Sequence, residues 1–257
     1  MATDISQNDR IRSVLVMLAT AATIAFNVLA AMGYINGTTP KAISDRYPTV
    51  LTPAGYAFSI WSLIYLGLAA FSVLQILPKN NERFAGIRTL YIVTCVLNCG
   101  WIFFWHHDRP VICLFLIALL AITLVVLVAR SRAIDSRTAK LAFGLYAGWV
   151  TVAAIVNLFV ALRVGGVSQS TDVATVFGVI AILAASTVGL LVAFRFKNYL
   201  YPLAAAWAIT AIAINQGGNT AIVVTCAVGV IVTLLAALSF VVYLPLLNIP
   251  RGGNEQR

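Results

Sequence analysis

Aromatic and amide side chains recur at helical spacing in three apolar segments of this sequence. The first segment carries Pro53, Tyr56, Phe58, Trp61 and Tyr65. The second carries Tyr91, Thr94, Asn98, Trp101 and Trp105, and the third carries Tyr146, Trp149, Ala153 and Asn157. Residues three, four or seven apart share one face of a helix. Because a buried indole or amide without a hydrogen-bond partner is costly in lipid, we expect these stripes to face a bundle interior or a ligand.

Simpler explanations exist for single residues of these stripes. Tryptophan and tyrosine favour the two interfaces of a membrane, and asparagine can join neighbouring transmembrane helices. The pairs Trp61 with Tyr65 and Trp149 with Asn157 are expected to lie deeper than an interfacial belt requires. Three stripes on three helices, each pairing aromatic rings with a polar group, make an interfacial belt a weaker explanation for the set than for any single residue.

Other chemistries have less support in the sequence. There is no nucleophile beside a base, no phosphate-binding glycine loop and no carboxylate pair, so we predict that the protein is not an enzyme. The adjacent imidazoles of His106 and His107 diverge on a short turn, so only one of them could act as a metal or haem ligand. The four cysteines lie in apolar segments without partners at zinc spacing. We therefore predict no metal site and no required cofactor.

The composition indicates which elements position these residues. The chain has 257 residues, of which 61% are hydrophobic and 10% are charged. Soluble domains are about 45–50% apolar and about 25% charged, whereas a membrane-spanning helix needs about 20 mostly apolar residues. The sequence therefore predicts an all-α, polytopic transmembrane helix bundle and excludes a soluble enzyme. The net charge of +9 is assigned to cytoplasmic loops, and we expect no binding of nucleic acid.

Polar and proline-containing breaks divide the chain into eight predicted spans. They are residues 13–35, 54–77, 88–105, 110–130, 141–162, 173–194, 199–214 and 220–247. Thirteen Lys and Arg residues fall on the amino-terminal side of these spans and four on the opposite side. Cytoplasmic loops carry the excess of basic residues, so we predict an integral protein of the cell or inner membrane with both termini in the cytoplasm.

The motifs of the second, third and fifth spans resemble the tryptophan-rich sensory protein and translocator protein family (TspO/MBR), which includes the peripheral benzodiazepine receptor. Its five helices carry a proline-containing loop before Trp-x-x-x-Tyr, then Asn-x-x-Trp, then Tyr-x-x-Trp followed eight residues later by Asn. The matching residues here are Pro53, Trp61, Tyr65, Asn98, Trp101, Tyr146, Trp149 and Asn157. The resemblance covers about residues 12–165. It departs from the family at Gly55-Tyr56, where a second tryptophan is usual, and at Leu145, where proline is common.

The resemblance implies a five-helix membrane domain, residues 1–165, and a three-helix C-terminal extension, residues 166–257. Within this extension, Trp207 and Asn215 repeat the Trp-x7-Asn pattern of the third stripe, either as a degenerate parallel repeat or by chance. We expect the binding cavity to lie among the second, third and fifth spans.

The resemblance also implies a binding or sensory protein for a flat, apolar ligand such as a porphyrin, haem or a sterol-like lipid. Its expected partners are the lipid bilayer and this small apolar or tetrapyrrole ligand. Two alternatives stay open, namely an eight-helix transporter of an apolar metabolite and a structural subunit of a larger membrane complex.

The Gly144-x3-Gly148 pattern is typical of close helix packing, within the bundle or in a homodimer.

Under the binding hypothesis, the expected ligand-binding residues come from all three stripes. They are Pro53, Tyr56, Phe58, Trp61, Tyr65, Asn98, Trp101, Trp105, Tyr146, Trp149 and Asn157. We expect their central tryptophans and asparagines to converge on one cavity, open near the loop of residues 36–52. The substitution Trp149→Ala should weaken binding by about tenfold or more. If the first five spans alone form the pocket, Trp207→Ala should weaken it much less.

Overall fold

The computed structural model describes residues 7–167 and 171–247, and the regular structure in these two ranges is entirely helical. The long helices are α1 (Gln7–Ala31), α3 (Ile60–Ile76), α4 (Asn81–His106), α5 (Pro110–Ser131), α6 (Arg137–Val164), α7 (Thr171–Phe196), α8 (Leu200–Asn215) and α9 (Thr220–Leu247). Three short elements complete the set, namely α2 (Pro40–Arg46), η1 (Gly55–Ser59) and η2 (Pro78–Asn80). The prediction of an all-α, polytopic bundle is confirmed.

Each of the eight predicted spans corresponds to one long helix. Within the described ranges, seven segments are long and apolar enough to cross a membrane, and α8 is a shorter apolar helix of 16 residues. At 1.5 Å per residue, α8 extends about 24 Å, less than the roughly 30 Å of a hydrocarbon core. It packs against α6, α7 and α9, and most of its residues are buried. The surroundings of α8 are therefore mainly protein.

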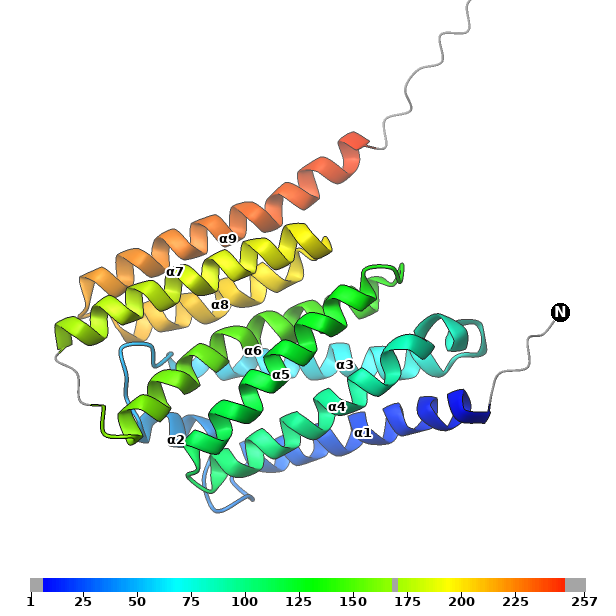
Figure 1. Ribbon diagram of the computed structural model, residues 1–257, viewed down its shortest axis with the longest axis horizontal. Helices are drawn as coiled ribbons and strands as arrows, with labels where there is room; N and C mark the ends of the chain where they lie inside the picture. Colours follow the sequence, from blue (N-terminus) through cyan, green and yellow to red (C-terminus); the bar gives the residue numbers. More distant parts are fainter. Residues whose placement is uncertain (1–6, 168–170, 248–257) are drawn as a thin grey trace, which may run out of the picture.

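Helix α6 lies between two groups of helices (Figure 1). It contacts α3 and α5 of the first group, which also includes α1 and α4, and it contacts α8 of the second group, which includes α7 and α9. Helices α1 and α9 respectively begin and end at the same end of the bundle (Figure 1). The chain termini themselves, including the basic Arg251 and Arg257, lie outside the described residues.

Helices α6 and α8 approach each other closely because two glycines of α6 face α8. A Cβ atom added to Gly144 would collide with the side chain of Asn198, and one added to Gly148 would collide with the carbonyl oxygen of Tyr201. The Asn198 Nδ2 atom also donates a hydrogen bond to the carbonyl oxygen of Lys140, at 3.0 Å. The Gly-x3-Gly pattern thus serves packing within the bundle, the first of the two uses that the sequence left open.

Several helix ends are fixed by side chains that the sequence places there. The hydroxyl of Ser136 accepts a hydrogen bond from the Ala139 N–H at the start of α6. The Asn198 Oδ1 atom accepts from the backbone at the start of α8, and the Asn219 Oδ1 atom accepts from the Ile222 N–H at the start of α9. Such caps satisfy N–H groups that a helix leaves unpaired at its first turn.

The predicted loops need two corrections. The loop of residues 36–52 contains the helix α2, where the Thr39 hydroxyl caps the first turn and Pro40 suits its first position. Helix α1 ends at Ala31, and the chain then turns through Gly33, whose φ of +80° is unfavourable for other residues. The capping hydroxyl, the proline and the glycine are local signals, and a search for long apolar segments does not detect them.

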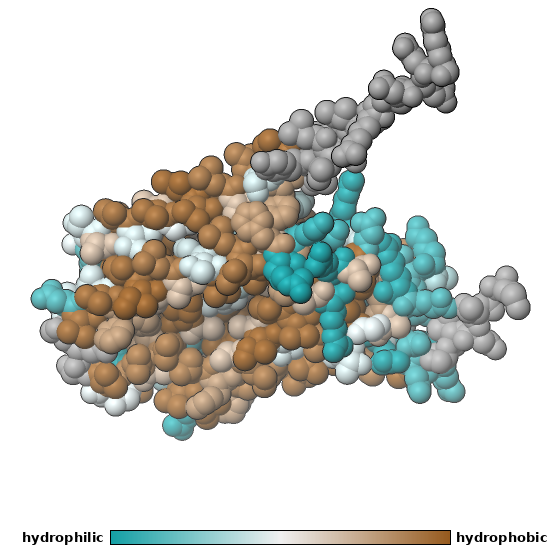
Figure 2. Space-filling model, turned by 45° about the horizontal axis from the view of Figure 1, so that its top comes forward, coloured by the Kyte–Doolittle hydropathy of each residue, from teal (hydrophilic) through white to brown (hydrophobic). Residues whose placement is uncertain are grey.

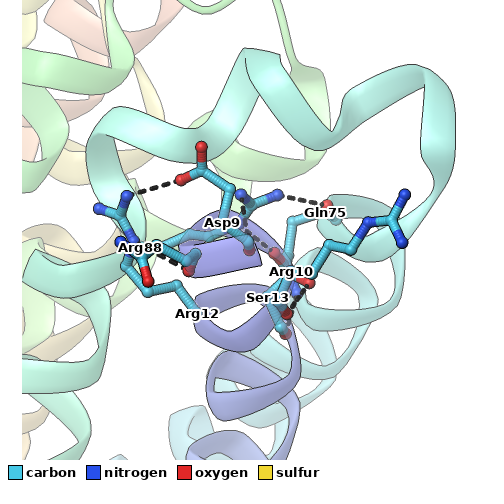
Figure 3. A network of polar contacts seen from close by, with 7 residues as sticks. Asp9, Arg10, Arg12, Ser13, Gln75 and Arg88 are labelled. Carbon is cyan, nitrogen blue, oxygen red and sulfur yellow. Dashed lines mark hydrogen bonds and ion pairs between the residues drawn. The ribbon is translucent and has the colours of Figure 1, made fainter. Parts of the chain in front are cut away.

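The second correction concerns the start of the third span, which the sequence pattern places at Arg88. Helix α4 begins at Asn81, so Arg88 lies inside the helix and its side chain is fully buried. Its guanidinium donates to Gln75 Oε1 at 2.7 Å, to the Gln75 carbonyl at 3.1 Å and to the Asp9 carbonyl at 3.4 Å. Figure 3 shows this network joining α1, α3 and α4. In the sequence this arginine marks the end of an apolar run, but these oxygens allow it to be buried within the bundle.

Apolar side chains cover the flank of the bundle, and hydrophilic residues gather at one end of it (Figure 2). Phe115, Leu66 and Leu191 are 71%, 68% and 63% exposed. Such exposure of large apolar residues along the helices is expected where lipid is the solvent.

Candidate ligand-binding site

The three predicted stripes meet around Trp61. Its ring stacks on Tyr65 with centroids 5.3 Å apart and contacts the ring of Tyr146 edge-on at 5.7 Å. It also contacts Trp149 at 6.2 Å and Trp101 at 6.4 Å. Because these residues come from α3, α4 and α6, the structure brings one aromatic face of each helix into a single cluster.

The amide groups of the stripes form buried hydrogen bonds. The Trp101 indole N–H donates to Asn157 Oδ1 at 3.2 Å, and the Asn157 Nδ2 atom donates to the Ala153 carbonyl at 2.9 Å. The Asn98 Oδ1 atom accepts from the Nδ2 atom of Asn27, on α1, at 2.7 Å. Among the described residues, the buried indole N–H of Trp149 makes no hydrogen bond. This N–H group is therefore a free donor within the cluster.

Two neighbouring cavities adjoin this cluster, where the sequence predicted one. The first, here called the α6 cavity, has a volume of about 40 Å³ and is lined by Ser44, Pro53, Phe58, Trp101, Trp105, Trp149, Val152, Ala153, Val156, Asn157, Ala208 and Ile212. The second, the α1–α3 cavity, has a volume of about 320 Å³ and is lined by Asn27, Val28, Ala31, Thr39, Pro40, Lys41, Phe58, Trp61, Ser62, Tyr65 and Ile102. Phe58 lines both cavities, and the ring of Trp61 contacts tryptophans of the α6 cavity.

Most of the predicted site residues line one of these cavities. Those on the α6 cavity are Pro53, Phe58, Trp101, Trp105, Trp149 and Asn157, and those on the α1–α3 cavity are Phe58, Trp61 and Tyr65. Asn98 and Tyr146 are buried and line neither cavity. Tyr146 contacts the ring of Trp61 and Asn98 is hydrogen-bonded to Asn27, so both support residues that line the α1–α3 cavity. Tyr56 also lines neither, and its ring packs edge-on against Trp207 with centroids 5.1 Å apart.

Helix α8 contributes to the wall of the α6 cavity, through Ala208 and Ile212. The first five spans therefore do not form this cavity alone. Alanine and isoleucine in an apolar helix carry no distinctive signal, which is why sequence reasoning missed them. The missed Asn27 of the α1–α3 cavity had a signal, because a buried amide in a membrane helix needs a partner.

The segment between α2 and α3 is held against α8 by hydrogen bonds. The Trp207 indole N–H donates to the Ala57 carbonyl at 3.1 Å, and the Ala54 N–H donates to the Ala211 carbonyl at 2.9 Å. The Asn215 Nδ2 atom donates to the Thr52 carbonyl at 3.1 Å. Trp207 and Asn215 of α8 therefore hold in place the segment whose Pro53 and Phe58 line the α6 cavity.

The loops near the cavities carry a small polar cluster. Arg46 forms an ion pair with Asp108 at 2.8 Å, and the Tyr47 hydroxyl donates to the same carboxylate at 3.3 Å. Burial and the negative charge of Asp108 raise the pKa of Tyr47 above its usual value of about 10, which keeps this hydroxyl protonated. Lys41, on the wall of the α1–α3 cavity, pairs with Asp45.

No group of three or more His, Cys, Asp and Glu side chains with the spacing of a metal site occurs in residues 7–167 and 171–247. His106 is buried, and its Nδ1 atom lies 2.8 Å from the Ile102 carbonyl, whereas His107 is exposed. The imidazole of His106 is therefore packed within the bundle, whereas that of His107 faces outward, as expected for adjacent residues at one end of a helix.

The fold and the aromatic cluster define a polytopic helical-bundle protein of the membrane, with aromatic-lined cavities between its helices. The chain belongs to the TSPO-like protein family (TspO/MBR), because the family model of that description matches residues 13–239. This match extends past residue 165 through α7, α8 and most of α9. A search of curated proteins and a search of solved structures gave no match to the chain. The long apolar helices and the family together make it an integral membrane protein.

Proposed function

We propose that this integral membrane protein binds a flat, apolar ligand, such as a porphyrin, haem or a sterol-like lipid, in a binding or sensory role. The observation that carries the proposal is the aromatic wall of the α1–α3 cavity beside the tryptophans of the α6 cavity. Membership of the TspO/MBR family supports the same ligand class, because the resemblance of the three motifs implied it.

The walls suit binding better than catalysis. Neither cavity is lined by a carboxylate, an imidazole or a thiol among the described residues. Stacked rings such as Trp61 and Tyr65 offer an extended flat surface, and an aromatic contact contributes about 0.5–1.5 kcal/mol beyond its buried area. The proposal therefore requires no cofactor and no metal, and it treats the tetrapyrrole as a ligand.

The volumes of the two cavities favour the larger one for the proposed ligand. Ligand pockets usually measure about 300–1,000 Å³, so the α1–α3 cavity, at about 320 Å³, accommodates a small planar molecule. The α6 cavity, at about 40 Å³, holds only a few water molecules. Because Phe58 lines both, a rotation of its side chain would extend the larger cavity toward Trp149. An acceptor oxygen on the ligand could then pair with the free indole N–H of Trp149.

The experiment is a titration of the purified protein in detergent with protoporphyrin IX, followed by tryptophan fluorescence. Four of the five tryptophans line the two cavities, so bound porphyrin should quench most of the emission in a saturable manner. We expect Trp61→Ala and Trp149→Ala to raise the dissociation constant by about tenfold or more, since each loses a ring contact and its buried area.

The matched control is Phe115→Ala, which removes a ring from the lipid-facing surface, where Phe115 is 71% exposed. It should leave the dissociation constant unchanged. Quenching that does not saturate, or an equal loss of affinity in the control, would overturn the proposal.

A further inference from the structure

A basic surface patch lies at the end of the bundle that carries the start of α1. It is formed by the end of α5, the start of α6 and the end of α7, and its members are Arg130, Arg132, Arg137, Lys140, Arg195 and Lys197. All are exposed except Lys140, which is half-buried. Figure 2 shows hydrophilic side chains gathered at this end of the molecule. The function proposed above uses none of these residues.

Two connections that are distant in sequence are held together to make the basic patch. A guanidinium nitrogen of Arg132 donates to the Arg195 carbonyl oxygen at 3.2 Å, and Asn198 donates to the Lys140 carbonyl at 3.0 Å. The guanidinium of Arg195 lies 5.8 Å from the ring centroid of Phe196. These contacts join the α5–α6 connection to the α7–α8 connection, so the cations form one surface.

The basic patch has little internal neutralisation. In residues 130–140 and 191–200, the one acidic residue is Asp135, so six cations and one anion leave a net charge of +5. Asp135 is 98% exposed and approaches Lys140 only to 3.7 Å. Such a positive surface attracts an anionic partner, with each basic residue near a membrane surface contributing about a fivefold gain in affinity.

The surroundings of the patch indicate that this partner is a lipid. Toward the middle of α7, the side chains of Phe194, which directly precedes Arg195, and of Leu191, one turn away, are 56% and 63% exposed. On α5, Ile122 and Val126 lie on the side of Arg130 toward the middle of the helix and are also exposed. Cations at the helix ends and apolar side chains beneath them match a phosphate headgroup and its acyl chains. We propose that the basic patch binds anionic phospholipid.

The test compares phosphatidylglycerol with phosphatidylcholine in native mass spectrometry of the detergent-solubilised protein, with inorganic phosphate as a third probe. We expect the wild type to retain phosphatidylglycerol with clear preference. The double variant Arg195→Gln/Lys197→Gln should lose roughly 25-fold in affinity for it, at about fivefold for each charge.

The matched control is Lys79→Gln/Arg83→Gln, at the same end of the bundle but outside the patch. Like Arg195, Arg83 has its guanidinium near the ring of the next residue, in this case Phe84, at 5.7 Å. The control should keep the preference for phosphatidylglycerol. Equal binding of the two lipids, an equal loss in the control, or binding of inorganic phosphate as tight as that of the lipid would each overturn the proposal. The last outcome would indicate that the patch binds a free anion.

Discussion

The contact between α6 and α8 can be tested by adding one methyl group. In Gly148→Ala, the new Cβ would overlap the carbonyl oxygen of Tyr201 and lie 3.0 Å from the Cβ of Ala204. Neither atom can rotate away, because one belongs to the backbone of α8 and the other is fixed to it. The substitution must therefore displace α8 from α6, and with it the part of the α6 cavity wall formed by Ala208.

The expected size of this effect follows from two opposing contributions. Replacing glycine by alanine inside a helix is favourable by about 0.8–1.0 kcal/mol, whereas overpacking a tightly packed interior costs about 1–3 kcal/mol. The control Gly86→Ala, on α4, places its Cβ where no atom lies within 4 Å, so it shows the favourable contribution alone. The free energies of unfolding of the two variants should differ by about 1–3 kcal/mol, with Gly148→Ala the less stable.

The assay is denaturant unfolding in detergent, followed by tryptophan fluorescence. Titration with protoporphyrin IX should in addition show weaker binding by Gly148→Ala than by Gly86→Ala. If both variants were stabilised to the same extent, α6 and α8 could not be packed as closely as described, and the account of the Gly-x3-Gly pattern would be refuted.

Three further predictions concern the buried arginine, the α8 contact and the orientation. The substitution Arg88→Met should lower the free energy of unfolding by about 2–3 kcal/mol in the same assay, because it leaves buried oxygens without a donor; an unchanged value would refute the role of the network. In contrast to the expectation for a pocket of five spans, Trp207→Phe should weaken porphyrin binding several-fold, since the carbonyl of Ala57 loses its donor. Unaltered binding would restrict the pocket to the first five spans. For the orientation, a membrane-impermeant maleimide should label His107→Cys but not Asn8→Cys in intact cells, with the wild type as background; the reverse pattern would place the amino-terminal end outside.

The sequence alone predicts the aromatic cluster well, for a physical reason. Rings at helical spacing in apolar segments must be buried or interfacial, and three such faces in one bundle can satisfy one another. The contacts of Trp61 with Trp101 and Trp149 confirm that the three faces meet. Whether ligand occupies the space beside them stays a prediction.

Other features could not be predicted, because they depend on partners that are distant in the chain. The burial of Arg88 depends on oxygens of Gln75 and Asp9, which a count of charged residues does not reveal. The wall formed by Ala208 and Ile212 depends on how α8 packs, and small apolar residues give no periodic signal for it. The separation into two cavities depends on the side-chain positions of Phe58 and Trp61.

The contact between Trp207 and Ala57 has a consequence for the order of assembly. These residues are 150 positions apart, and chains are synthesised at about 5–20 residues per second, so the first helices wait about 8–30 s before α8 emerges. During that interval the carbonyls of Thr52 and Ala57 lack their donors from α8, and the tryptophans of the α6 cavity face lipid or water on that side. Insertion of the last helices is therefore the step of biosynthesis that closes the site.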